Sequence, residues 1–285
     1  MGLKVSLWLT ILIFSSPIHA KETIQWMYSD FPPAFIVKGE NTGKGYVDLT
    51  QKLLINALPE YRHIKIKANY ARSNLELSQK DNICHAALLK TAEREKFTEF
   101  SIAAYIVFGN KLIINQHDNA ILKPYFMKNK TIDLASLMAS GDFKLGIAKG
   151  AKYGTPIDQI LKSHFNKVSI FERSAEDHFS GLSKMLSLKN REINATLGFE
   201  VEIRYALTQL GANDINLKTY SIDGSAQYEL GYIGCSKTKI GKTIIQKINK
   251  ILIKNRANKI SRFYEKWLSN SESIEHKKWL KIFLY

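Results

Sequence analysis

The sequence predicts an α/β protein with two lobes. Three observations lead to this fold class: residues 23–89 give the order strand, helix, strand, strand; residues 143–198 again alternate strands and helices; and 45% of the 285 residues are hydrophobic, as in ordinary globular proteins. The sequence itself is not repeated between the halves. The repetition of element order therefore indicates two α/β lobes of ~100–150 residues each.

The first lobe opens with an apolar stretch at 23–28, which predicts a strand that ends at two prolines in the following turn. Leucines at helical spacing over 47–58 predict a helix. Residues 64–68 alternate like a strand, and the continuous apolar run at 83–89 is typical of a strand buried on both faces. This order is a normal α/β opening.

A long extended apolar segment at 105–115 leads into the second set of elements. That set has predicted strands at 143–148, 168–171 and 193–198, a glycine turn at 150–154, and helices from 155 and around 182–188. The tail is predicted to be helical, because apolar residues form stripes over 240–252 and 260–268. We expect both stripes to pack against the body of the protein.

The chain is basic, with 41 Lys and Arg against 26 Asp and Glu and a net charge of +15. Such a charge attracts polyanions, but the sequence has no compact basic run with interleaved aromatic residues. We therefore expect a solvated basic surface and no nucleic-acid partner. The mean hydropathy of −0.19 excludes a polytopic membrane channel.

The first 20 residues have the layout of a secretory signal peptide. Lys4 gives a basic start, an apolar stretch follows, and Ala20 precedes the expected cleavage point. The apolar stretch is roughly half of the length that a bilayer-spanning helix needs. We therefore expect residues 1–20 to be a signal peptide and the mature protein to lie in the periplasm, without a lipid anchor because no cysteine follows the cut.

Cys84 and Cys235 are the two cysteines of the chain. In an exported protein an even number of cysteines suggests a disulfide. Two separately buried thiols are the alternative, and the spacing alone does not decide between them. Because C-x-x-C motifs and Cys/His ligand clusters are absent from the sequence, we expect neither a metal site nor a cofactor.

Several motifs point to one known family. The segments 26–33 (WMYSDFPP), 43–48 (GKGYVD) and 91–101 (TAEREKFTEFS), together with Tyr105, resemble the first lobe of bacterial extracellular solute-binding proteins of family 3. These are type II periplasmic binding proteins that serve polar amino-acid uptake. The Thr-x-x-Arg element at 91–94, followed by Phe-Ser, is the most specific part of the resemblance.

The resemblance covers residues 22–268 and is closest to a divergent subgroup, which shares the segment 235–238 (CSKT). It implies the two-lobe periplasmic binding protein-like II fold with two crossover strands. Lobe 1 would comprise 21–110 and 229–285, and lobe 2 would comprise 111–228. The strand order of the family also places the returning strand with Cys235 beside the strand with Cys84, which implies a disulfide between them within lobe 1.

The resemblance also implies a carboxylate site. In well-studied members the arginine of the Thr-x-x-Arg element binds the α-carboxylate of the ligand, and here that residue is Arg94, in the element that Thr91 opens. A planar guanidinium pairs with a carboxylate through two parallel hydrogen bonds. The alternative is a surface arginine beside Glu93 and Glu95.

Five further residues are candidates for contact with the ligand. Tyr28 and Phe31 match the cleft floor, where an aromatic ring stacks on a flat ligand; core packing is the alternative for Phe31. The turn at Lys149 and Tyr153 offers backbone N–H groups to an anion. Glu200 is the acid nearest to the position that meets a ligand amine in the family; the alternative is a solvated acid at a helix start.

Three residues depart from the pattern of amino-acid binders. Ala87 and Leu89 stand where a small residue and then a hydroxyl residue usually precede the Thr-x-x-Arg element, so one expected donor to the carboxylate is missing. Phe199 stands where an aspartate usually meets the amine. A site for a cationic group therefore depends on Glu200.

These observations predict a monomeric, non-catalytic periplasmic protein that captures a small, polar, carboxylate-bearing ligand in an interlobe cleft. The resemblance further implies hinge closure and delivery to the membrane subunits of an ABC importer. One alternative is a dehydratase-type enzyme on the same scaffold, with Glu200, His85 or His178 as acid or base. Another is a sensory or partner-binding module of the periplasm.

Overall fold

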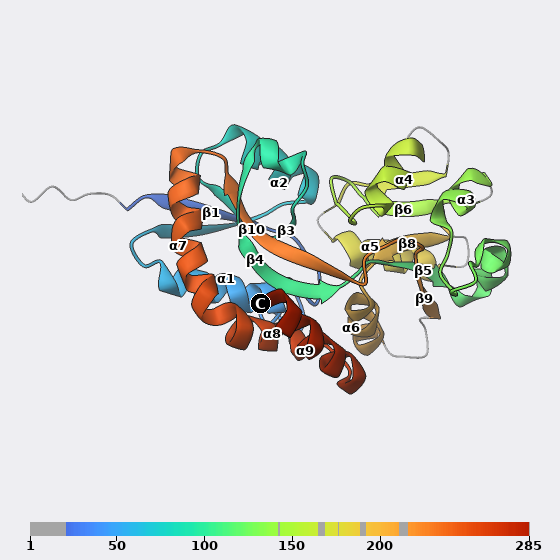
Figure 1. Cartoon of the computed structure of the whole chain (residues 1–285). Coiled ribbons are helices and arrows are strands. Elements are labelled where there is room, and N and C mark those ends of the chain that lie inside the picture. Colours follow the sequence, from blue (N-terminus) through green and yellow to red (C-terminus); the bar gives the residue numbers. More distant parts are fainter. Residues whose placement is uncertain are drawn as a thin grey trace, which may run out of the picture.

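The structure is a computed structural model, and it describes residues 21–141, 143–164, 169–175, 177–188, 192–210 and 216–284. The chain forms two lobes, each built on a five-stranded sheet (Figure 1). The predicted α/β class and two-lobe architecture are confirmed. The signal peptide expected at 1–20 lies outside the described residues.

The sheet of lobe 1 has the strand order β2-β1-β3-β10-β4. Its strands are β1 (Thr23–Tyr28), β2 (Arg62–Lys67), β3 (Ile83–Leu89), β4 (Thr98–Phe108) and β10 (Tyr228–Ser236). β1 pairs in parallel with β2 and β3, whereas β10 is antiparallel to both β3 and β4. β3 therefore lies inside the sheet, as its apolar sequence predicts.

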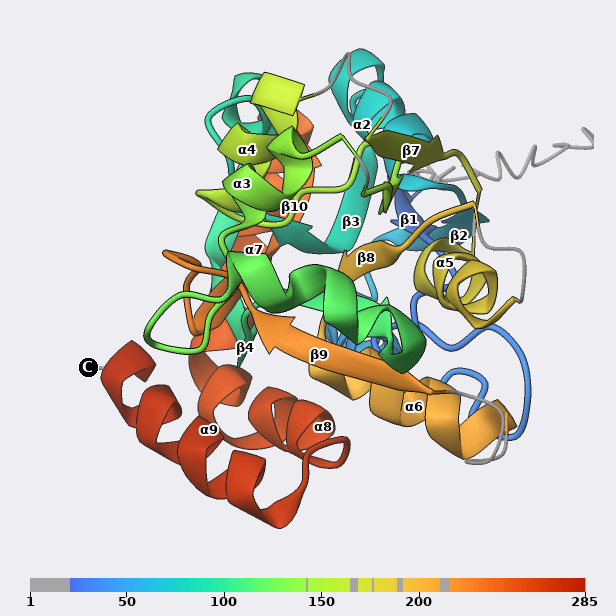
Figure 2. The same cartoon turned by 90° about the vertical axis from the view of Figure 1, so that its right-hand side faces the viewer.

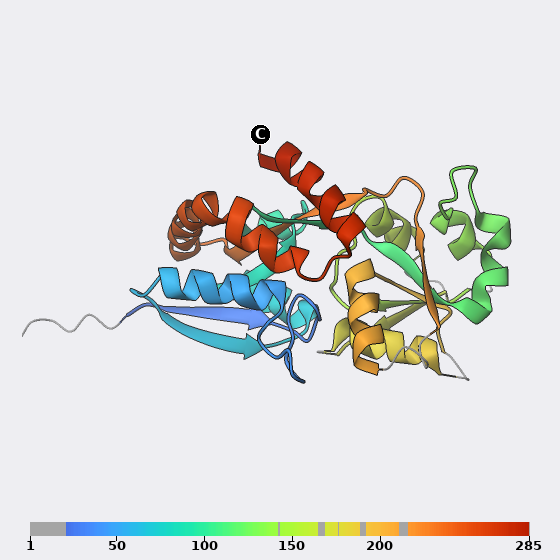
Figure 3. The same cartoon turned by 90° about the horizontal axis from the view of Figure 1, so that it is seen from below.

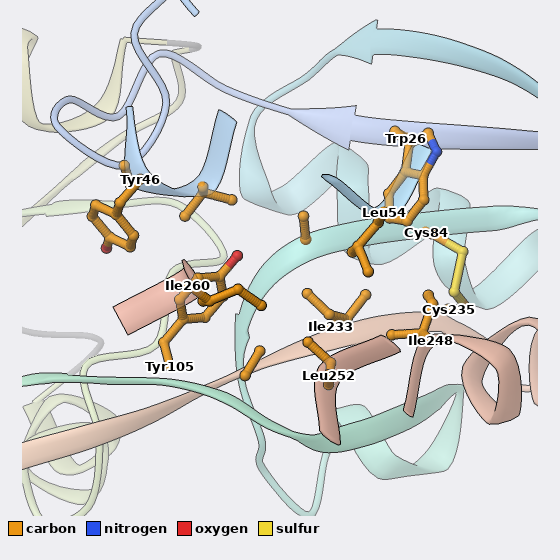
Figure 4. Close-up of a cluster of buried hydrophobic side chains, with 14 of the residues drawn as sticks. Trp26, Tyr46, Leu54, Cys84, Tyr105, Ile233, Cys235, Ile248, Leu252 and Ile260 are labelled. Carbon is orange, nitrogen blue, oxygen red and sulfur yellow. A yellow bond between two sulfur atoms is a disulfide. The ribbon is translucent and has the colours of Figure 1, made fainter. Parts of the chain in front are cut away.

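Alternate residues of these strands pack against different helices. Trp26 belongs to the large cluster that α1 (Tyr46–Ala57) and α7 (Lys239–Asn255) complete with Leu54 and Ile248 (Figure 4). Met27, the next residue of β1, belongs instead to the cluster that Leu77 of α2 (Tyr70–Gln79) completes. The period of two along a strand thus places helices on both faces of the sheet.

The sheet of lobe 2, the lobe that faces the viewer in Figure 2, has the order β7-β6-β8-β5-β9. Its strands are β5 (Lys111–Asn115), β6 (Leu145–Ala148), β7 (Ile170–Arg173), β8 (Ala195–Gly198) and β9 (Leu217–Ser221). Its helices are η2 (Gln116–Tyr125), α3 (Leu134–Ala139), α4 (Ile157–His164), α5 (His178–Ser187) and α6 (Glu200–Leu210). The second half thus repeats the mixed α/β architecture of the first.

The chain passes between the lobes twice. Residues 109–110 join β4 to β5, and residues 222–227 join β9 to β10. The backbone N–H of Gly109 donates to the carbonyl of Gln227 at 2.8 Å, and a Cβ at position 109 would overlap the carbonyl oxygen of Ala226. The extended segment predicted at 105–115 is therefore two strands of different sheets, separated where the chain changes lobe.

Three helical segments follow α7 at the C-terminus. They are the π-helical segment η3 (Arg256–Ile260), α8 (Ser261–Glu265) and α9 (Asn270–Leu284), and α9 crosses lobe 1 near the junction of the lobes (Figure 3). The sequence analysis does not predict α9. Across the part of the chain that is described, none of the helices combines the length and the apolar character needed to cross a bilayer.

Cys84 and Cys235 form a disulfide, which confirms the pairing implied by the family resemblance. The two residues are direct partners in the register of β3 and β10, with Cα atoms 4.0 Å apart, and both are fully buried (Figure 4). The bond closes a loop of 151 residues. It therefore joins the first α/β unit of lobe 1 to the strand that returns from lobe 2.

Reduction of this disulfide should lower the free energy of unfolding by about 2–4 kcal/mol, because the chain-entropy model gives roughly 5 kcal/mol for so long a loop as an upper figure. Urea unfolding with and without reductant measures the difference. Alkylation of unreduced, denatured protein is the control, and intact mass should show no added label. Two labels without reduction would contradict the assignment.

Candidate ligand-binding cleft

A cavity lies between the two lobes, at the carboxyl ends of strands β3, β6 and β8. The volume of the cavity is about 80 Å³. This is room for roughly five to eight water molecules. Lobe 1 contributes Phe31, Tyr46, Tyr70, Ala87, Leu88, Leu89, Arg94, Tyr105, Val107 and Gly231, and lobe 2 contributes Ala148, Ala151, Lys152, Tyr153, Leu182, Leu197, Gly198, Phe199 and Glu202, with Asn110 at the crossover. The ends of parallel strands are the usual ligand position in such sheets.

Arg94 is the cation of lobe 1 in this cavity, and it is only 2% exposed. Its Nη1 donates to the carbonyl of Leu89 at 3.0 Å, and its Nη2 donates across the lobes to the carbonyl of Gly150 at 3.2 Å. Nε is buried and makes no hydrogen bond to the described residues. Burial lowers the pKa of the guanidinium, but arginine keeps its charge in proteins.

No carboxylate forms an ion pair with Arg94 within the described residues. Its guanidinium contacts the two carbonyls and the ring of Tyr70, whose centroid lies 6.0 Å from Cζ. A buried charge that is hydrogen-bonded only to neutral groups is expensive to keep in a protein. The arrangement is therefore suited to receive an anionic group.

The local sequence explains the position of Arg94. Thr91 accepts the backbone N–H of Arg94 at 3.3 Å, and its carbonyl accepts that of Glu95 at 2.9 Å. These bonds start the short helix η1 (Arg94–Lys96) directly after β3. Arg94 is the first residue of η1, so its side chain points back over the end of β3 into the cavity.

The segment 43–48, which is one of the motifs of the family resemblance, holds Phe31 in the cavity wall. Asp48 accepts the backbone N–H groups of Ile36 at 2.8 Å and Gly45 at 3.2 Å. A Cβ at Gly45 would overlap the carbonyl oxygen of Ala34. These contacts fix the loop after β1, where Phe31 lies 6.3 Å from Phe199 of lobe 2 between ring centroids.

Glu202 of α6 is the acid that lobe 2 places in the cavity, and it is only 2% exposed. Its Oε2 accepts the backbone N–H of Phe199 at 3.1 Å, whereas Oε1 has no hydrogen-bond partner among the described residues. Burial raises the pKa of this carboxyl well above its usual range, and the bond from Phe199 offsets only part of that shift. Burial therefore favours the protonated form of Glu202 over the carboxylate.

Of the predicted ligand residues, Phe31, Arg94 and Tyr153 line the cavity. Tyr153 is buried. Its hydroxyl accepts a hydrogen bond from the backbone N–H of Ala148 at 2.9 Å, and its backbone carbonyl accepts one from the side-chain amide of Asn110 at 3.1 Å. Ala87 and Leu89, which depart from the family pattern, also line the wall. Leu89 supplies a backbone carbonyl to Arg94 in place of a side-chain donor to the ligand.

The other four predicted residues lie outside the lining. Tyr28 packs against Phe35 at 6.1 Å, because β1 turns its side chain into lobe 1. Thr91 acts through the backbone of Arg94, as described above. Lys149 is exposed, and its backbone N–H donates to the backbone carbonyl of Arg173 at 2.9 Å. Glu200 stays half-exposed at the start of α6.

Glu202 takes the position expected for Glu200, because both lie in the first turn of α6. Two residues along a helix differ by about 200° in direction. Only one of the two acids can therefore face the cavity. Tyr46, Tyr70, Asn110 and Glu202 are lining residues that the sequence analysis does not identify; the acid-rich start of α6 is the sequence signal that points to Glu202.

The lobes are in contact around the cavity. Lys152 of lobe 2 forms an ion pair with Glu93 of lobe 1 at 2.7 Å, and Asn74 donates to the carbonyl of Gly150 at 3.2 Å. Gly150 has φ +75°, and a Cβ there would lie 2.7 Å from the backbone nitrogen of Ala71. A larger residue at 150 would hold the lobes apart. The structure is thus a closed form.

Of the two histidines proposed as acid or base, His85 lies away from the cavity. His85 is fully buried in β3, stacks on Tyr70 with centroids 5.6 Å apart, and is absent from the cavity lining. The side chain of His178 is outside the described part of the structure. Nowhere in the described ranges do three or more His, Cys, Asp or Glu side chains gather as a metal site would require.

No protein-family model and no curated protein matches the sequence, but solved structures do. An ancestral arginine-binding protein bound to arginine shares 19% identity at a TM-score of 0.65, covering 88% of this chain and 100% of that one. A putative L-cystine ABC transporter from Listeria monocytogenes shares 18% at 0.63, covering 88% and 97%. The BvgS VFT2 domain from Bordetella pertussis shares 14% at 0.59, covering 87% and 93%. The predicted two-lobe periplasmic binding protein fold is thereby confirmed.

The burial of Glu202 should make the stability of the empty protein depend on pH. Since its pKa is raised in the folded state, folding retains a proton that the unfolded chain releases, so stability should fall as pH rises above about 4.5 toward the raised pKa. Glu202→Gln should remove part of this loss and raise the melting temperature more at pH 8 than at pH 5. Glu200→Gln on the same helix is the control. Equal shifts of the Glu202→Gln protein at both pH values would contradict the assignment.

Proposed function

We propose that this protein is a periplasmic solute-binding protein that captures a small carboxylate-bearing, amino-acid-like ligand between its lobes. The observation that carries this proposal is Arg94, a guanidinium 2% exposed in an interlobe cavity with no carboxylate paired to it among the described residues. A ligand carboxylate supplies the missing anion. Its two oxygens match the planar donor fork of the guanidinium.

Glu202 supports a ligand that also carries an amine. When an ammonium group approaches, Glu202 can release its proton and form a charged pair that its isolated burial otherwise disfavours. Between the two charged groups the walls are largely apolar, with Phe31, Leu182 and Phe199 on them. These features favour a compact zwitterion with an apolar or aromatic body over a long polar ligand.

Capture in a closing cleft fits uptake by an ABC importer, and we include delivery to such membrane subunits in the proposal. Amino-acid ABC transporter proteins occur among the structures of similar fold. Export to the periplasm and the lobe boundaries at 110/111 and 228/229 belong to the same proposal. A sensory role is the alternative, since the BvgS VFT2 domain also shares the fold.

The ligand can be identified by mass spectrometry of the compounds released when purified protein is denatured. A thermal-shift screen of amino acids, with matched analogues of each hit, then tests the two charged groups. The amide of the hit lacks the carboxylate, and its N-acetyl form lacks the amine. A ligand at 100 times its Kd should stabilise the protein by about 2.7 kcal/mol; equal stabilisation by the amide would overturn the role of Arg94.

A dehydratase on this scaffold is the second candidate function. The observation that favours it is the buried carboxyl of Glu202 in the cavity. A carboxyl in a cavity whose pKa is raised by burial is a candidate general acid. Incubation of arogenate-like cyclic acids with the protein, followed by product analysis, separates the candidates. Turnover that Glu202→Gln abolishes would favour the enzyme, whereas stoichiometric recovery of intact ligand favours capture.

Arg94→Ala should weaken binding of the identified ligand by at least about 100-fold, because it removes a desolvated, two-point charged contact. Arg94→Lys should also bind poorly, since an ammonium does not reproduce the fork. The free energy of unfolding should change by less than about 2 kcal/mol, because the loss of two carbonyl bonds is offset by relief of a buried charge. Calorimetry measures both, with exposed Arg72→Ala as the control. Affinity within threefold of the parent protein would contradict the assignment.

Ligand should shift the protein toward the closed form. In the closed form Arg94 of lobe 1 bonds Gly150 of lobe 2, so ligand and lobe contacts form together. Small-angle scattering at saturating ligand should give a smaller radius of gyration than empty protein. Identical curves under proven saturation would argue against capture by closure.

A further inference from the structure

Helix α6 touches lobe 1 through a face that is separate from the ligand cavity. Val201, Arg204 and Tyr205 lie at i, i+3 and i+4, which places them on one side of the helix. Val201 is buried in the core cluster of lobe 1, and the ring of Tyr205 lies 5.6 Å from that of Trp267. α6 thus belongs to lobe 2 by sequence but packs on the C-terminal segment of lobe 1 (Figure 3).

Arg204 makes the polar part of this contact. Its Nη1 donates to the carbonyl of Trp267 at 2.8 Å, and its Nη2 contacts both carboxylate oxygens of Glu272, at 2.8 and 2.7 Å. The side chains of Arg204 and Glu272 are 35% and 16% exposed. This partly dry, multi-point geometry is stronger than an ordinary surface ion pair.

The carboxylate of Glu272 is also held by hydrogen bonds within its own lobe. Its Oε2 accepts both the backbone N–H and the hydroxyl of Ser269 at 2.7 Å. Ser269 precedes α9 and Glu272 lies in its first turn, so these bonds form a capping box. Because the carboxylate is already held, pairing with Arg204 costs little further side-chain entropy.

The rest of α9 is anchored to lobe 1 at the crossover. His276 is 3% exposed and bonds the carbonyl of Ile106 through Nε2 at 3.0 Å. The ring of Trp279 lies 4.2 Å from that of Tyr228 and 6.4 Å from that of Phe108. These are the end of β4 and the start of β10, where the chain passes between lobes. α9 is therefore a fixed part of lobe 1.

We infer that Arg204, Tyr205, Trp267 and Glu272 form an interlobe latch that keeps part of the ligand-free protein closed, so that open and closed forms coexist until a ligand binds. Arg204 and Glu272 belong to different lobes, so opening of the cleft separates them. Glu202 and Arg204 point to opposite sides of α6, about 200° apart. The same helix thus carries the latch on one side and the cavity acid on the other.

The inference rests on the proposed function only in treating closure as the step that captures ligand, and its test uses empty protein. Exposed Lys52 on lobe 1 and Lys162 on lobe 2 are replaced by cysteine and labelled, and single-molecule energy transfer measures the closed population. Glu272→Gln should lower the ratio of closed to open molecules by three- to tenfold. Arg204→Gln should lower it by at least as much, and the double variant should lower it by less than a further twofold, because both changes remove one interaction.

The matched control is Glu60→Gln, which removes the Lys247–Glu60 ion pair of 2.8 Å inside lobe 1 and should leave the ratio within twofold. The exchanged pair Arg204→Glu with Glu272→Arg should restore the ratio to within about threefold. The free energy of urea unfolding should fall by no more than about 1.4 kcal/mol, the equivalent of a tenfold change in the ratio, in all variants that shift it, which separates a latch from a loss of folding. A fully open empty protein, or a ratio that Glu272→Gln does not change, overturns the latch; absence of a ligand in the screen overturns the proposed function alone.

Discussion

A guanidinium buried at the interface of two lobes constrains the rest of this molecule. Arg94 keeps its charge, and among the described residues its guanidinium donates only to the carbonyls of Leu89 in one lobe and Gly150 in the other. Neutral carbonyls solvate an ion less well than water or a carboxylate. The closed form must therefore be supported by other contacts until an anion arrives, and the structure distributes these contacts around the cavity.

Those contacts depend on how the chain connects the lobes. β10 returns from lobe 2 between β3 and β4, and the Cys84–Cys235 bond fixes it to the first α/β unit. The two crossover segments lie together at Gly109. Motion at this junction moves whole lobes, because each sheet has its own buried core. Small changes near the crossover are thus transmitted to the cavity walls.

The parts of the site that follow from strands could be predicted, whereas the parts that depend on helix register could not. The role of Arg94 follows from the family resemblance, whose Thr-x-x-Arg element lies directly after the buried strand β3. Glu202 was missed in favour of Glu200, since the sequence does not fix where β8 ends and α6 begins to within two residues. A shift of two residues moves a side chain to the other side of a helix.

Helix α9 was missed for a different reason. It lies beyond the family resemblance, and its apolar residues do not fall on one stripe: Ile274 and Ile282 are 61% and 73% exposed, whereas Trp279 packs against Tyr228. A helix that is held by a capping box, a histidine bond, an ion pair and the ring contacts of Trp279 carries little hydrophobic periodicity. Its place at the crossover is a property of tertiary structure alone.

The separation of Arg94 from Glu202 is what suits the cavity to the proposed zwitterionic ligand. Both side chains are buried and unpaired with each other; Arg94 keeps its charge, whereas burial raises the pKa of the Glu202 carboxyl and favours its protonated form. Direct pairing would relieve both desolvation costs and fill the space with a structural salt bridge. Arg94 is instead tied to η1 of lobe 1 and Glu202 to α6 of lobe 2, so each charge stays on its own lobe. A ligand with opposite charges at its two ends can satisfy both groups at once, and only when the lobes are closed.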